Sequence, residues 1–114
     1  MKIHGASQSS GAERQLTIEK GLEGIVLTIF HKVIRKECGR IIVPAEILVA
    51  AIMEPQAGGS AIEGLPQPQG PKSSLHIEVR RNEVWLTIRP GETVDIAVGL
   101  DDLQDALEGV ISKE

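Results

Sequence analysis

Strict alternation of apolar and polar residues marks two short segments as half-buried strands. Leu16 and Ile18 alternate with polar neighbours, and Leu75 and Ile77 do the same. Each segment is followed, after seven residues, by the sequence Leu-Thr-Ile, at 27–29 and at 86–88. The two patterns lie 59 residues apart at both ends. A period of this size indicates a duplicated supersecondary unit.

The periodicity and the positions of glycine and proline predict the elements of each half. In the first half we expect strands at 15–20, 25–32 and 40–43, then a helix at 44–53 with Pro44 in its first turn. In the second half we expect strands at 75–80, 84–89 and 93–98, then a helix at 100–111. The strand-to-helix ends match at an offset of 55, so the first half carries four extra residues within 30–39. For Val33–Arg40 we consider two alternatives, an extension of the second strand or the end of a long hairpin. Within it, Val33–Lys36 is a candidate for an extra strand.

Two stretches lack this periodicity. Residues 1–14 are small and polar, which predicts a flexible N-terminal tail. Residues 54–74 hold four prolines and four glycines, so we expect a linker without regular structure. We therefore predict a single domain, 15–114, of two repeats (15–53 and 75–111) joined by that linker. The predicted fold class is α+β: a duplicated βββα unit, with a mostly antiparallel sheet and two helices packed on one face.

The two predicted helices differ in character. The second has an apolar stripe and an acidic opposite side, which is typical of a helix lying on a sheet. The first is apolar all round, and a large exposed apolar patch usually marks a partner. We expect it to form the interface of a homodimer, through Ile47, Val49, Ala50 and Met53. The alternative is that the linker covers this helix through Ile62 and Leu65.

The composition of the chain limits the classes of protein, and of function, that we expect. Hydrophobic residues make up 41% and charged residues 25% of the chain, as in globular proteins. A single cysteine, Cys38, excludes an internal disulfide and fits a reducing compartment. We expect a cytoplasmic protein without a membrane partner, because no apolar run reaches membrane-spanning length and no signal-peptide core is present. The three histidines and one cysteine lack metal-ligand spacing, and no nucleophile or phosphate-loop pattern occurs. We therefore predict no enzyme, no metal and no cofactor.

The face opposite the predicted core carries the candidate binding residues. The net charge is −4, so an anion site requires a local basic patch. Aromatic rings among cations on an open sheet are what single-stranded nucleic acids bind. The candidate nucleic-acid-binding residues are Phe30, Lys32, Arg35, Lys36, Arg80, Trp85 and Arg89. The alternatives are that this face packs on another sheet or subunit, and that the basic run at 31–40 is a solvated loop.

The strand-to-helix ends, RIIVPAEIL at 40–48 and DIAVGLDDL at 95–103, together with the hairpins before them, carry a resemblance. A curved antiparallel sheet followed by a helix, given twice, resembles the PC4/Whirly/Pur group of single-stranded nucleic-acid-binding proteins. That group usually has four strands per unit, where three are predicted here. The resemblance covers residues 15–111 at the level of architecture. It implies a non-enzymatic binding or regulatory module with single-stranded nucleic acid on its open sheet face. The alternative is a homo-oligomeric protein–protein interaction module with no nucleic-acid ligand.

Overall fold

The computed structural model describes residues 1–54, 58–65, 73–89 and 94–112. Its described strands belong to one antiparallel sheet in the order β4-β3-β2-β1-β8-β7-β6-β5. The elements are β1 (Lys2–Ala6), β2 (Glu13–Lys20), β3 (Ile25–His31), β4 (Lys36–Val43), α1 (Ala45–Met53), β5 (Ser60–Glu63), β6 (Ser74–Arg80), β7 (Glu83–Arg89), β8 (Asp95–Gly99) and α2 (Leu100–Ser112).

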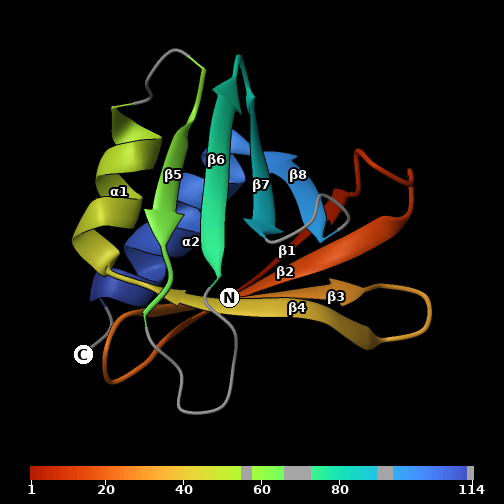
Figure 1. The fold of residues 1–114 in the computed structure, drawn as a ribbon, viewed down its shortest axis with the longest axis horizontal. Helices are drawn as coiled ribbons and strands as arrows, with labels where there is room; N and C mark the ends of the chain where they lie inside the picture. Colours follow the sequence, from red (N-terminus) through yellow and green to blue (C-terminus); the bar gives the residue numbers. More distant parts are fainter. Residues whose placement is uncertain (55–57, 66–72, 90–93, 113–114) are drawn as a thin grey trace.

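The sheet curls until it forms a nearly closed barrel (Figure 1). Strand β4, at one edge, contacts β6 and β7 near the other edge. The N–H of Leu65, just after β5, donates to the carbonyl of Ile42 in β4 at 2.8 Å. Gly39 of β4 also lies close to Val94, just before β8, and a Cβ at that position would lie 2.5 Å from a methyl carbon of Val94. The apolar faces of the strands therefore meet in one core that both helices share.

The predicted fold class, a duplicated βββα unit with two helices on one face of a sheet, was wrong. Two additional strands are present: β1 lies inside the predicted tail 1–14, and β5 lies inside the predicted linker 54–74. Each is short and contributes a single buried aliphatic side chain, Ile3 from β1 and Ile62 from β5. Such a weak alternation is not detectable in the sequence. With four strands before each helix, the sheet is wide enough to curl around its own core.

Strand β1 is held by pairing, not by its composition. It aligns with β2 over five residue pairs, but with β8 only at Ala6 and Ala97. Gly5 is required at this junction, because a Cβ there would lie 2.3 Å from the carbonyl oxygen of Ala97. The short β1–β8 ladder is the seam between the first four strands and the last four.

A carboxylate strengthens this seam. Asp95, at the start of β8, accepts hydrogen bonds from the hydroxyls of Ser7 (2.7 Å) and Ser9 (2.8 Å) and from the backbone N–H groups of Gln8 and Ser9. Arg14 of β2 donates to its carbonyl oxygen at 2.7 Å and pairs with its carboxylate at 3.2 Å. Burial raises the pKa of Asp95, but the hydrogen bonds from Ser7, Ser9 and Gln8 outweigh it and hold this pKa below its ordinary value.

The two helices lie close to their predicted bounds. α1 begins directly after Pro44, whose φ of −62° suits a helix start. It buries Leu48 and Ile52, while α2 buries Leu103, Ala106, Leu107 and Val110. Val33–Lys36 forms no extra strand: residues 32–35 are the turn of the β3–β4 hairpin, and Lys36 is the first residue of β4.

Candidate functional site

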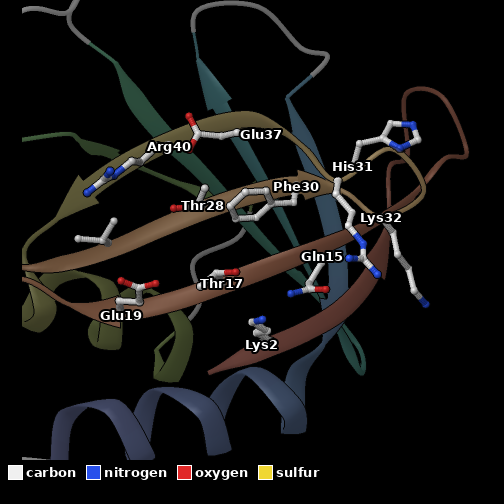
Figure 2. A pocket seen from close by; sticks show the side chains of 12 residues that line it. Lys2, Gln15, Thr17, Glu19, Thr28, Phe30, His31, Lys32, Glu37 and Arg40 are labelled. Carbon is white, nitrogen blue, oxygen red and sulfur yellow. The ribbon is translucent and has the colours of Figure 1, made fainter.

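A groove of about 790 Å³ runs over the face of β1–β4 that points away from the core. Its floor contains the short side chains of Thr17 and Thr28, at the centres of β2 and β3, and longer side chains rise around them (Figure 2). This difference in side-chain length hollows a surface that would otherwise be flat. The groove is lined by Lys2, Gln15, Thr17, Glu19, Val26, Thr28, Phe30, His31, Lys32, Arg35, Glu37 and Arg40.

The strand register places opposite walls of the groove. Thr17 aligns with Lys2 on β1 and with Thr28 on β3, and Thr28 aligns with Arg40 on β4. One cross-strand row therefore begins and ends with a cation. The next row places Phe30 between Gln15 and Glu37, after a register shift in β4 at Ile29/Phe30. Side chains on alternate positions share one face of a strand, so Phe30 and the two threonines face the groove together.

The charges of the groove are mixed, with an excess of cations. Lys2, Lys32, Arg35 and Arg40 contribute positive charge, and Glu19 and Glu37 contribute negative charge. Within the part of the chain that the structure describes, none of these six side chains forms an ion pair. The phenyl ring of Phe30 is half-buried, which leaves part of it accessible from the groove. An aromatic ring can stack on a planar group, and cations beside the ring can bind the anionic substituents of that group.

The second aromatic side chain has a different environment. Arg80 lies over the ring of Trp85, with its guanidinium carbon 4.0 Å from the ring centroid. The same arginine pairs with Glu78 at 2.9 Å, and the indole N–H of Trp85 donates to Glu83 at 3.1 Å. All four residues come from the β6–β7 hairpin. Their charges and the Trp85 ring are already engaged with one another.

The structure divides the predicted nucleic-acid-binding residues between these places. Phe30, Lys32 and Arg35 come together in the groove, whereas Trp85 and Arg80 form the separate cluster on β6–β7. Strands β3 and β7 are separated in the sheet by β2, β1 and β8, so the two aromatics do not share a surface patch. Lys36 and Arg89 are exposed and line neither site.

Several groove residues were missed from the sequence. Lys2 was assigned to the tail, and Arg40 was considered only as part of the basic run. The alternation of Gln15, Thr17 and Glu19 with apolar neighbours on β2 was a detectable signal, because it marks a solvent-facing row beside Phe30. The pairing of β1 with β2, which brings Lys2 to this row, had no detectable signal.

The predicted dimer surface is only partly covered. Ile47, Ala50 and Met53 are exposed and Val49 is half-buried. Ile62 is buried, and Leu65, just after β5, is half-buried. Between α1 and β5 lies a second groove of about 390 Å³. Among the described residues of the predicted linker, β5 therefore lies beside α1 and leaves Ile47, Ala50 and Met53 exposed.

The remaining observations concern metal binding, membrane-spanning helices and similarity to known proteins. No group of three or more His, Cys, Asp or Glu side chains in this part of the chain is arranged to hold a metal ion. None of its helices has both the length and the apolar character needed to cross a membrane. No family model, curated protein or solved structure matches the chain significantly.

Proposed function

We propose that the protein is a non-enzymatic binding module that holds single-stranded nucleic acid in the groove over β1–β4. The observation that carries this proposal is the combination of Phe30 with four cations that have no ion-pair partner among the described residues, around one open groove. A base can stack on the Phe30 ring while phosphates meet Lys32, Arg35 or Arg40. The floor threonines and Gln15 offer hydrogen bonds to base edges or sugars.

A single strand fits this surface better than a duplex. The groove contains one aromatic ring facing outward, and only unpaired bases expose their faces for stacking. The lining residues come from strands and a hairpin turn, and none of them belongs to a described helix that could enter the major groove of a duplex. Stacking tolerates every base, so we expect little sequence preference.

The test is the anisotropy of a fluorescent oligothymidylate of about ten nucleotides, a length within the site sizes of single-strand binders. We expect binding at low salt, with log K falling against log salt at a slope of about −0.7 per phosphate neutralised, and about −3 if all four cations participate. Arg40→Gln should weaken binding and make the slope shallower. Arg89→Gln, which removes an exposed charge outside the groove, is the matched control. Absence of binding at low salt, or equal loss in both variants, would refute the proposal.

A further inference from the structure

The tip of the β3–β4 hairpin is unusual in its composition. Val33 is 74% exposed and Ile34 is 63% exposed, at positions of a turn where Gly, Pro, Asn or Asp are favoured. Lys32, Arg35 and Lys36 flank them in the sequence. Arg35 has a φ of 53°, a backbone conformation that residues other than glycine rarely adopt. Two aliphatic side chains are thus presented to solvent on a cationic projection.

The groove between α1 and β5 has the complementary character. Ala50, Ala51 and Ala61 line it with small side chains, and Ile47 and Ile62 add apolar surface. Ile47 is 51% exposed, although it belongs to the apolar side of a helix. The charged residues of α1, of β5 and of the described chain between them are the exposed Glu46, Glu54 and Glu63. Residues 45–63 contain no lysine or arginine.

The two features lie at opposite ends of the molecule. Figure 1 shows α1 and β5 at one end of the long axis and the β3–β4 hairpin at the other. The tip of a chain therefore cannot fill the groove of the same chain. Burial of Val33 and Ile34 against Ile47 would remove apolar surface from both sides, and the surrounding cations and carboxylates have opposite signs.

We infer that the protein associates head to tail, with the β3–β4 hairpin tip of one copy docked in the α1–β5 groove of a second copy. Such an interface is heterologous, so each added copy leaves one free tip and one free groove. The predicted two-fold dimer is thereby replaced by a series that grows with concentration. This inference does not depend on nucleic-acid binding.

Sedimentation equilibrium of the whole chain, from micromolar to millimolar concentration, tests the growth. We expect the weight-average mass to rise beyond that of a dimer without a plateau. A monomer across the whole range, or a plateau at the dimer, would overturn the inference.

Two complementary variants test the surfaces. The double variant Val33→Ser/Ile34→Ser removes the two apolar side chains of the tip, and the second variant, Ile47→Lys, places a charged side chain in the groove. All three residues are exposed, so the fold should tolerate both variants. Each variant alone should be monomeric, because it retains only one surface. Their equimolar mixture should form a dimer that does not grow, because one intact groove meets one intact tip.

The control variant is Leu22→Ser, which removes a fully exposed leucine from the β2–β3 turn. It should associate like the unmodified chain. A mixture that remains monomeric, or a Leu22→Ser variant that is also monomeric, would contradict the assignment of tip and groove. If circular dichroism shows that Ile47→Lys is unfolded, Ala50→Lys blocks the same groove from another exposed position.

Discussion

The β3–β4 and β6–β7 hairpins contain similar residues in different environments. Each has one aromatic on its outward face, Phe30 or Trp85, and each turn contains an arginine at positive φ, Arg35 (53°) or Arg81 (51°). On β6–β7 the cation Arg80 already covers the aromatic ring and pairs with a carboxylate. On β3–β4 the ring borders an open groove. Two hairpins of similar residue content therefore differ in whether the aromatic ring and its neighbouring charges are already paired.

Spacing along the strands accounts for this difference. On β6–β7, Glu78 and Trp85 are directly opposed, and Arg80 is opposed to Glu83, so the four side chains form a compact set. On β3–β4, the register shift at Ile29/Phe30 places Glu37 beside Phe30 and leaves the cations at the rim. Bulges of this kind redirect side chains and are frequent beside functional sites.

The largest expected effect concerns the seam that joins the two halves. Asp95→Ala removes the carboxylate that accepts hydrogen bonds from the Ser7 and Ser9 hydroxyls and pairs with the buried Arg14, and it leaves the Arg14 bond to the backbone carbonyl of residue 95 in place. We expect the free energy of unfolding to fall by about 3 kcal/mol, as for other broken buried pairs. Urea denaturation measures it, with Asp101→Ala on the exposed side of α2 as the control. If the two halves fold independently, the transition should instead split into two steps.

Truncation of the two aromatic side chains compares the contributions of the two hairpins to oligonucleotide binding. Phe30→Ala should weaken oligothymidylate binding by about 1–3 kcal/mol, which is the usual loss for a stacking ring. Trp85→Ala should leave the affinity unchanged, because Arg80 occupies its ring. Anisotropy titration of both variants at the same salt concentration provides the measurement. Equal losses would place the ligand on a surface that spans both hairpins.

The two turn arginines provide a matched test of strain. Glycine tolerates positive φ, so Arg35→Gly and Arg81→Gly should each raise the free energy of unfolding by about 1 kcal/mol or slightly less. Only Arg35→Gly should also weaken oligonucleotide binding, because only Arg35 lines the groove. Thermal melts and anisotropy on the same samples measure both effects. A variant pair with the same binding loss would show that the loss is not specific to the groove.

The smallest expected effect is a pH dependence of the seam. The folded pKa of Asp95 lies below its unfolded value of 3.8, so its contribution to stability is present above pH 3.8 and is lost as the pH falls through the folded pKa. Stability should therefore decline in this acidic window, and it should decline less steeply in Asp95→Asn, which cannot titrate. Urea midpoints measured from pH 5 downward, in steps of about half a unit around the ordinary carboxyl range, test this. Parallel declines would assign the acid sensitivity to other carboxylates.

The sequence by itself determined the elements with strong local signals. Alternation at Leu16–Ile18 and Leu75–Ile77, the hairpin positions and both helices are present close to the predicted residues. The outward orientation of Phe30 also followed from period-two alternation, because the core side of a strand dictates its other side. The exposed apolar side chains of α1 at Ile47 and Met53 were expected for a different reason, because the sequence of this helix is apolar on every side.

Only the tertiary structure decided the features that depend on contacts distant in sequence. Strands β1 and β5 each bury one aliphatic side chain and exist because neighbouring strands supply their hydrogen bonds. Their presence turns the expected open sheet into a nearly closed barrel and brings Lys2 to the wall of the groove. The separation of Phe30 from Trp85 likewise depends on strand order, because β1 joins β8 at the centre of the sheet. Local sequence specifies which face a residue takes, whereas pairing over long separations specifies which residues share that face.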